Sequence, residues 1–398
     1  MKQAYIIDIL RSPVGKFNGA LSTLRPDDLA AHVLKAIVAR NPWLDPNEIE
    51  DVIFGAANQS GEDNRNVARM AVLLAGLPQS IGGVTVNRLC ASGLQSIADA
   101  ARSIQSGNGE VYIAGGVESM SRAPYVLSKA ANAFDRAQQM FDTTMGWRFT
   151  NKAFSKEVTF AMGETAENVA SKWKISREAQ DAFALASQQK YEAAHSAGKF
   201  GNEIGAVEID KGKSGKVLFE KDEHPRTTSI ADLAKLKPAF TKDGSVTAGN
   251  SSGINDGAAA AIVVGEDVVK RYNLQPFARI AATAAVGVEP AYMGIGPVPA
   301  TQKALQRAGI SINDIGLVEL NEAFASQSLA CIQDLQLNTE IVNVNGGSIA
   351  IGHPLGCSGV RISATLLHEM KRRTNVRYAL ATMCIGVGQG MAVVYEKA

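Results

Sequence analysis

The sequence predicts an α/β protein built from two similar halves, with a long insertion in the first half. Short apolar runs of strand length alternate with helical patterns at both ends of the 398-residue chain. The string PNEIEDVIFGAA at 46–57 resembles INDIGLVELNEA at 312–323, which indicates a duplicated unit. A more polar stretch interrupts the first copy. We therefore expect a first half at 1–120 plus 250–272, an inserted loop domain at 121–249 and a second half at 273–398.

The first half is expected to alternate strands and helices. Pro26 followed by Asp27 and Asp28 is typical of a helix start, because proline needs no amide hydrogen there and acidic groups favour the positive end of the helix dipole. Strands are expected at 4–9, 51–55, 83–89, 111–114 and 259–264, and helices at 26–39 and 91–106.

The second half is expected to repeat this order, and the insertion is expected to carry one long helix at 176–195. Strands are expected at 278–286, 315–320, 341–345 and 378–384, and helices at 298–308 and 359–370.

Charge and composition exclude several classes of function. Lys and Arg number 40 against 39 Asp and Glu, a net charge of +1 that gives no support for binding to nucleic acid or to a membrane surface. There is no apolar run of membrane-spanning length and no secretory or peroxisomal signal. The four cysteines lack the close pairing of a zinc site, and their number does not suggest a disulfide framework, so we expect a cytoplasmic protein.

Cys90 follows the strand expected at 83–89 and begins the next helix. The free amides and dipole of a helix N-terminus favour the thiolate, which is the nucleophilic form of cysteine. The small residues that follow leave room for a substrate. A buried structural cysteine is the alternative.

His353 lies in a glycine-rich loop, NGGSIAIGHPLG at 345–356. Pro354 disfavours helical backbone at His353, and a rigid loop that holds an imidazole suits a general base for a thiol. A loop histidine with only a structural hydrogen bond is the alternative.

Two further residues end expected strands. Cys384 begins the run CIGVGQG at 384–390, whose backbone amides are candidates for an oxyanion site rather than a phosphate loop. Asn321 follows the strand at 315–320 and could orient a water or a carbonyl, or merely cap a turn. Because open α/β sheets bind ligands at the carboxyl ends of strands, we expect Cys90, Asn321, His353 and Cys384 to converge.

Several sequence segments, which occur in order over nearly the whole chain, resemble the motifs of the thiolases. They are VNRLCASG, GGVESMSRAP, MGETAENVA, NSSGINDGAAA, MGIGPVPA, NEAFA, NGGSIAIGHPLGCSG and CIGVGQG. The resemblance implies two halves of β-α-β-α-β type stacked as an α-β-α-β-α sandwich, with a loop domain that binds coenzyme A.

The resemblance also implies roles for the catalytic residues. Cys90 matches the nucleophile that takes the acyl group, and His353 matches its base. Cys384 matches the second acid/base, which moves a proton at C2 of acetyl-CoA. Asn321 matches the residue that holds a water in one oxyanion hole, where His353 is the other donor. The backbone amides of Cys90 and Gly386 match the second hole.

The substrate-binding residues are implied in the same way. Ser252 matches a contact to pantetheine, while Met162, Phe324 and Met293 match pocket walls. Arg226 falls near the adenine-side arginine of the family.

The resemblance implies an acyltransferase, acetyl-CoA C-acyltransferase, that cleaves 3-ketoacyl-CoA with coenzyme A in the manner of fatty acid β-oxidation. Coenzyme A and acyl-CoA are then substrates, no cofactor or metal is expected, and a homodimer or homotetramer is expected. Ala161 stands where acetoacetyl-CoA enzymes carry a histidine, and MFDTTMGWRFTN at 140–151 resembles the degradative and 3-oxoadipyl-CoA branches. The alternatives are an acetoacetyl-CoA-specific acetyltransferase and a 3-oxoadipyl-CoA thiolase.

Other classes remain as alternatives. A condensing ketosynthase would pair its cysteine with two histidines, whereas Asn321 occupies the second place. A non-catalytic binder of coenzyme A or lipid would lack one of the three reactive groups. A metal site of Cys90, Cys384 and His353 is conceivable. A dinucleotide oxidoreductase is disfavoured because no G-x-G-x-x-G motif opens a helix after the first strand.

Overall fold

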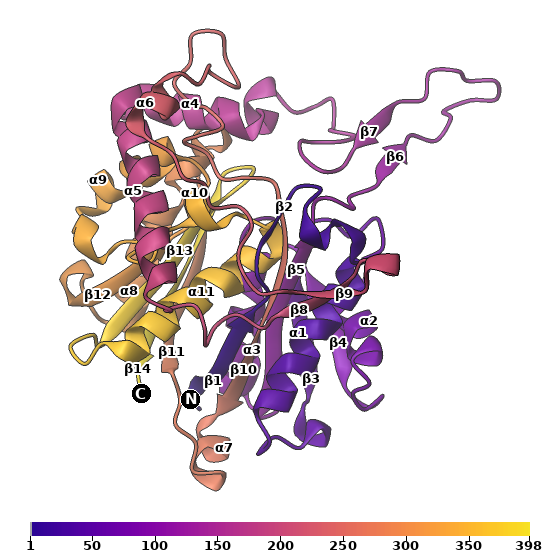
Figure 1. Ribbon diagram of the computed structural model, residues 1–398, viewed down its shortest axis with the longest axis vertical. Coiled ribbons are helices and arrows are strands. Elements are labelled where there is room, and N and C mark those ends of the chain that lie inside the picture. Colours follow the sequence, from indigo (N-terminus) through magenta and orange to yellow (C-terminus); the bar gives the residue numbers. More distant parts are fainter. Residues whose placement is uncertain (1) are drawn as a thin grey trace.

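A computed structural model describes residues 2–398, apart from the side chain of residue 214. The two halves lie side by side, and most of the inserted segment lies over one end of them (Figure 1). The first half consists of β1 (Ala4–Arg11), β2 (Gly15–Lys16), α1 (Pro26–Arg40), β3 (Asp51–Gly55), α2 (Val67–Leu74), β4 (Gly82–Val86), α3 (Ser92–Ser106), β5 (Val111–Ser119), β10 (Asn255–Gly265) and α7 (Glu266–Arg271).

The insertion between β5 and β10 contains a hairpin that projects from the body, two long helices and a second small hairpin (Figure 1). Its elements are β6 (Tyr125–Leu127), β7 (Met140–Asp142), α4 (Met162–Lys172), α5 (Arg177–Ser196), β8 (Val207–Asp210), β9 (Lys216–Phe219) and α6 (Ile230–Ala234).

The second half repeats the plan of the first. It consists of β11 (Ala278–Gly287), α8 (Pro297–Ala308), β12 (Ile315–Leu320), α9 (Ala325–Leu335), α10 (Ser348–Ile351), α11 (Leu355–Arg372), β13 (Tyr378–Ile385) and β14 (Gln389–Lys397).

The strand order demonstrates the duplication. The first half has the order β4-β3-β5-β10-β1, and the second half has β12-β13-β14-β11. In each half a parallel pair is followed by antiparallel strands, with β3 parallel to β5 and β12 parallel to β13. The halves join where β1 pairs with β11 through Tyr5–Arg279 and Ile6–Ala278, so one ten-stranded sheet runs through the molecule.

The strand expected at 341–345 is not formed, and this prediction was wrong. Residues Thr339–Ile341 form a short 3-10 turn, and only Val342 bridges to Val318 of β12. The reason is the Asn343 side chain, which accepts a hydrogen bond from the Leu320 amide (2.9 Å) and donates one to the Leu320 carbonyl (2.8 Å). A side chain thus occupies the backbone groups that a strand would have used.

Two other expected boundaries also differ. The strand expected at 83–89 ends at Val86, and the strand expected to end before Gly115 runs on to Ser119. Gly115 and Gly116 do not end β5. A Cβ on Gly116 would lie 2.0 Å from the Gly356 carbonyl oxygen, so this glycine allows β5 to pass against the start of α11.

Alternate strand residues face different cores, which explains the layers. On β1, Ile6 and Ile9 belong to a central core that also contains α3 and α11, whereas Ile7 and Leu10 face α1 and α2. A bulge between Ile6 and Asp8 shifts this alternation by one residue. A third core lies between the second half of the sheet and α8 and α9. Helices therefore lie outside each half and between the two halves.

The two central helices approach unusually closely. A Cβ on Gly359 of α11 would lie 2.1 Å from the Leu94 amide nitrogen of α3, and a Cβ on Gly93 would lie 2.8 Å from the Gly356 carbonyl oxygen. Only glycine at these positions permits such a close approach of the two backbones. The close approach brings the N-terminal ends of α3 and α11 together.

We expect Gly359→Ala to lower the free energy of unfolding by about 2–3 kcal/mol, because the new methyl group meets rigid backbone rather than a flexible side chain. Urea unfolding followed by circular dichroism measures this loss. Gly205→Ala is the matched control, since its Cβ would have no neighbour closer than 3.8 Å. An equal effect of the two substitutions would contradict this account of the helix contact.

Candidate active site

Cys90 lies in a tight turn between β4 and α3. The Arg88 amide donates to the Ser92 hydroxyl (2.9 Å), which donates in turn to the Leu89 carbonyl (2.7 Å). Leu89 has a positive φ of 47°, which is costly for a branched side chain. The turn holds the partly exposed Cys90 just before Ala91, the N-cap of α3.

His353 lies in the equivalent turn before α11. Gly352 has a φ of 110°, and a Cβ there would lie 2.6 Å from the side-chain carbon of Asn255. The same Asn255 side chain accepts a hydrogen bond from the His353 amide (2.9 Å). The duplication thus places the thiol and the imidazole at corresponding ends of two helices in contact.

Hydrogen bonding determines which nitrogen of His353 carries the proton. The Ser358 hydroxyl donates its only hydrogen to the Pro354 carbonyl (2.8 Å), so its oxygen accepts from His353 Nδ1 (2.6 Å). Nε2 is therefore the unprotonated nitrogen. Burial, with a smaller contribution from the charge of Arg361, lowers the pKa of His353 to about 3. The imidazole is neutral near pH 7, and its Nε2 is free to accept a proton.

Asn321 and Cys384 come from the ends of β12 and β13. The Asn321 amide donates to the Thr382 carbonyl (3.0 Å), and its side-chain Nδ2 lies 3.4 Å from His353 Nε2. Burial raises the pKa of Cys384, and the neighbouring Cys90 thiol raises it further. A Cβ on Gly386, two residues after Cys384, would lie 3.3 Å from Leu89, which directly precedes Cys90, so the two thiols lie in the same largely dry region.

Gly386 contributes a backbone donor to the same region. Its amide lowers the pKa of the Cys90 thiol, but burial has the larger effect and raises that pKa to about 11. The helix N-terminus favours the Cys90 thiolate as expected, but desolvation has the larger effect on the pKa of this thiol. Cys90 needs a base to become a nucleophile.

The run that contains Gly386 is the turn of a hairpin. Val387 and Gly388 have positive φ values of 60° and 71°, and β14 follows at once. A side chain on Gly386 would crowd Trp147, Leu89 and Met162, whose nearest atoms lie 3.1–3.4 Å from its Cβ position. The glycine thus keeps space open beside Cys90.

Apolar side chains enclose the Cys384 thiol. The expected pocket residues Met162, Met293 and Phe324 form one cluster with Cys384. Phe240 packs edge-on against Phe324, with ring centroids 6.1 Å apart. The insertion therefore covers the ends of the second-half strands.

Ser252 and Arg226 lie in irregular segments between β9 and β10. The Ser252 amide donates to the Ala323 carbonyl (3.0 Å), and the exposed Arg226 donates from its backbone amide to Gln188 (3.0 Å). The His224 ring lies against Gly253, and desolvation together with the charge of Arg226 lowers its pKa to about 4. Lys235, by contrast, is exposed and pairs with Asp232 (3.1 Å).

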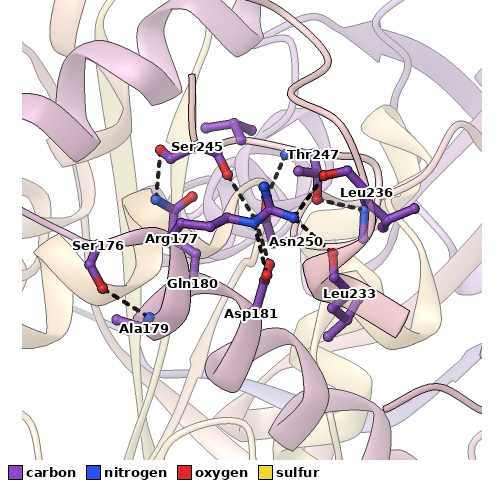
Figure 2. Close-up of polar contacts among 12 residues, drawn as sticks. Ser176, Arg177, Ala179, Gln180, Asp181, Leu233, Leu236, Ser245, Thr247 and Asn250 are labelled. Carbon is purple, nitrogen blue, oxygen red and sulfur yellow. Dashed lines mark hydrogen bonds and ion pairs between the residues drawn. The ribbon is translucent and has the colours of Figure 1, made fainter. Parts of the chain in front are cut away.

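A polar network fixes the segment that leads to Ser252 (Figure 2). Arg177 bonds to Asp181 (2.8 Å) and to the carbonyls of Leu233 (2.8 Å) and Leu236 (2.9 Å). Asp181 in turn accepts from the Asn250 side chain (2.9 Å), so α5 anchors the turn from Ser245 to Asn250.

Sequence reasoning missed several supporting residues. Ser358, Asn255 and Trp147 carry no signal in spacing or periodicity. Glu118 accepts amide hydrogen bonds from Ala57, Asn58 and Gly356 (2.8–3.0 Å), and burial raises its pKa to about 7. For Glu118, the only signal in the sequence is that a carboxylate lies within the otherwise apolar strand 111–119.

Within residues 2–398, no three histidine, cysteine or acidic side chains are grouped to hold a metal ion. In the same range, none of the helices has the length and apolar character needed to cross a bilayer.

Residues 4–267 match the family model of the thiolase N-terminal domain, and residues 274–397 match that of the thiolase C-terminal domain. The chain belongs to the thiolase family. It is 55% identical to the 3-oxoadipyl-CoA/3-oxo-5,6-dehydrosuberyl-CoA thiolase of Escherichia coli K12, with all of both chains covered. It is 52% identical to the β-ketoadipyl-CoA thiolase of Pseudomonas aeruginosa, covering 100% of this chain and 99% of the relative.

The fold of this thiolase also matches a solved structure with a bound ligand. Human mitochondrial 3-ketoacyl-CoA thiolase in complex with CoA aligns with a TM-score of 0.92 at 41% identity, covering 100% of this chain and 98% of the human chain. The expected α/β thiolase fold is confirmed.

We expect alkylation of Cys90 by iodoacetamide to accelerate about tenfold per pH unit between pH 7 and pH 9, because only the thiolate reacts and the raised pKa of Cys90 keeps its fraction small. Peptide mass spectrometry measures the labelling rate, with the fully buried Cys331 as an internal control. A rate that levels off by pH 8 would show a preformed thiolate and contradict the proton assignment above.

Proposed function

We propose that this thiolase cleaves 3-oxoadipyl-CoA with coenzyme A, through an acyl group carried on Cys90. The proposal rests on two features: Cys90 and His353 lie in the turns before two helices that are in contact, and His353 is neutral with an unprotonated Nε2. Cleavage between C2 and C3 of this substrate yields acetyl-CoA and succinyl-CoA.

In the first step, Cys90 loses its proton to His353 Nε2 and its sulfur attacks the C3 carbonyl. The C2–C3 bond then breaks, and its electron pair forms the enolate of acetyl-CoA. Cys384 protonates the C2 carbon, and a succinyl thioester remains on Cys90. The raised pKa of Cys384 suits this role, because a thiol that keeps its proton is available as an acid.

In the second step, the thiol of coenzyme A attacks the succinyl thioester. Its proton passes to Cys384, which lost one in the first step, and the proton held by His353 returns to Cys90 as its sulfur leaves. Succinyl-CoA is released, and Cys90, His353 and Cys384 regain their resting protonation states. Kinetics of the ping-pong type follow from this order.

Two groups of donors stabilise the negative oxygens. We assign the backbone amides of Cys90 and Gly386 to the acyl oxygen on Cys90. We assign Asn321, through a water, and His353 to the enolate oxygen of acetyl-CoA. Each such donor is typically worth about 10²–10³-fold in rate.

The choice of 3-oxoadipyl-CoA over a fatty 3-ketoacyl-CoA draws on the names of the two bacterial relatives above and on one cation. A carboxylate at the far end of the acyl chain needs a positive partner. Trp147 lies beside Gly386, and the next residue, Arg148, is partly buried and has no hydrogen bond or ion pair elsewhere in residues 2–398. We assign Arg148 to the distal carboxylate. The exposed Ala161 at the N-cap of α4 agrees with a substrate longer than acetoacetyl-CoA.

We also propose that the enzyme acts as a homodimer or homotetramer. In support, the β6–β7 hairpin projects from the body and exposes Tyr125, Leu127 and Met140, each by more than 60%. Exposed apolar groups on a projecting hairpin favour contact with another chain.

We expect Cys90→Ala to abolish the acyl adduct that acetyl-CoA forms on the wild-type enzyme, whereas Cys384→Ala should still acylate but lose carbon–carbon bond cleavage by at least about 10³-fold. Intact-protein mass spectrometry detects the adduct, and thiolysis of 3-oxoadipyl-CoA is followed in parallel. Cys331→Ala is the control for loss of a buried thiol. An acetyl adduct on Cys90→Ala would disprove the assignment.

We expect the wild-type enzyme to prefer 3-oxoadipyl-CoA to 3-oxohexanoyl-CoA, which has the same length but no carboxylate. Arg148→Met should lower kcat/KM for 3-oxoadipyl-CoA by about 10-fold or more and leave 3-oxohexanoyl-CoA within about threefold, because the lost contact is a charge-assisted bond. Arg136→Met, an exposed arginine of the projecting segment, is the control. A wild-type preference for 3-oxohexanoyl-CoA would instead support a general 3-ketoacyl-CoA thiolase.

A further inference from the structure

Ser348 is the first residue of α10 and is fully buried. It lies between two side chains that belong to different elements, Asn321 after β12 and Arg361 of α11. Its hydroxyl accepts a hydrogen bond from Arg361 Nη2 and donates one to Asn321 Oδ1 (2.6 Å).

The guanidinium of Arg361 determines the direction of this chain of hydrogen bonds. A guanidinium can only donate, so Ser348 must receive its hydrogen bond at the oxygen. The single hydroxyl hydrogen of Ser348 is then free to point only at Asn321. In the structure Asn321 accepts that hydrogen at its carbonyl oxygen, and its Nδ2 amide faces His353 Nε2 at 3.4 Å.

The bond from Ser348 is the only restraint on the Asn321 carbonyl oxygen. Within residues 2–398, Oδ1 of Asn321 makes no other hydrogen bond. If the amide rotated by half a turn, Oδ1 would face the lone pair of His353 Nε2, and the site would lose its donor. The orientation of Asn321 therefore depends on whether Ser348 donates.

The Arg361 guanidinium makes few polar contacts besides the bond to Ser348. Its Nε and Nη1 have no hydrogen-bond partner in the described residues, and Glu319 lies 3.7 Å from Nη1. Both side chains are buried. The bond to Ser348 is thus the one hydrogen bond that this guanidinium makes within the described range, and a buried charge holds such a bond firmly.

We propose that Ser348 is a positioning residue. It accepts from Arg361 and donates to Asn321, so that Asn321 directs its amide hydrogens toward His353 and toward the water assigned to the enolate oxygen. This inference rests on the proposed function, because it concerns how the enolate donor is held. Loss of the Ser348 hydroxyl should therefore slow the chemical step without weakening binding of coenzyme A.

The test compares Ser348→Ala with Ser363→Ala in steady-state thiolysis of 3-oxoadipyl-CoA. Ser363 is the matched control, because it is also fully buried and hydrogen-bonded, but to the Gly359 carbonyl and Tyr395. We expect Ser348→Ala to lower kcat by about 10- to 100-fold with KM changed by less than about threefold, and Ser348→Thr, which keeps a hydroxyl, to restore most of kcat. If Ser348→Ala does not fold, Ser348→Cys takes its place, since a thiol is a weak donor.

A double-mutant cycle separates positioning from a structural effect. In an Asn321→Ala background there is no amide to orient, so adding Ser348→Ala should lower kcat by no more than about twofold further. An equal loss in both backgrounds, or a Ser348→Ala enzyme as active as Ser363→Ala, would overturn this inference alone. A wild-type chain that cleaves no 3-ketoacyl-CoA would overturn the proposed function and this inference with it.

Discussion

The close approach of α3 and α11 is the constraint on which the rest of the molecule depends. Each helix follows a turn that carries a reactive group, Cys90 before α3 and His353 before α11. Gly93, Gly356 and Gly359 remove the side chains that would hold the helices apart. The central core then packs against both halves of the sheet at once, so the two turns lie at the same end of the molecule.

The burial that follows from this packing shifts the pKa values of the two thiols and of the imidazole in opposite directions. Desolvation raises the pKa values of Cys90 and Cys384 and lowers that of His353, so all three are neutral at rest. A neutral site tolerates a dry environment, and in the proposed mechanism charge develops only when a proton moves from the Cys90 sulfur to His353. The donors that meet this charge are held in advance, which avoids the cost of reorganising them during the reaction.

The insertion completes the site from outside the duplicated halves. It covers the second half through α4 and α5, and contributes Met162 beside Cys384 and Trp147 beside Gly386. The network around Arg177 and Asp181 ties α5 to the segment that leads to Ser252. The duplicated halves thus contain the proposed reacting groups, while the insertion contributes apolar side chains that line the pocket around them.

Local periodicity, glycine and proline, and the order of the motifs predicted most strands of the two halves, the helices α1, α3, α5, α8 and α11, and the four strand-end or turn residues. They did not predict α2, α9 or β14. Strand 51–55 and the strand at 315–320 form as expected, since each is a short apolar run with a sharp start. Features that depend on contacts between segments distant in the sequence could not be predicted and became visible only in the tertiary structure. The segment 341–345 fails as a strand because Asn343 occupies the backbone of Leu320, and Gly116 marks a helix contact rather than a strand end. The raised pKa of Cys90 likewise depends on burial, the tautomer of His353 on Ser358, and the orientation of Asn321 on Ser348 and Arg361. These contacts exist only once both halves are packed.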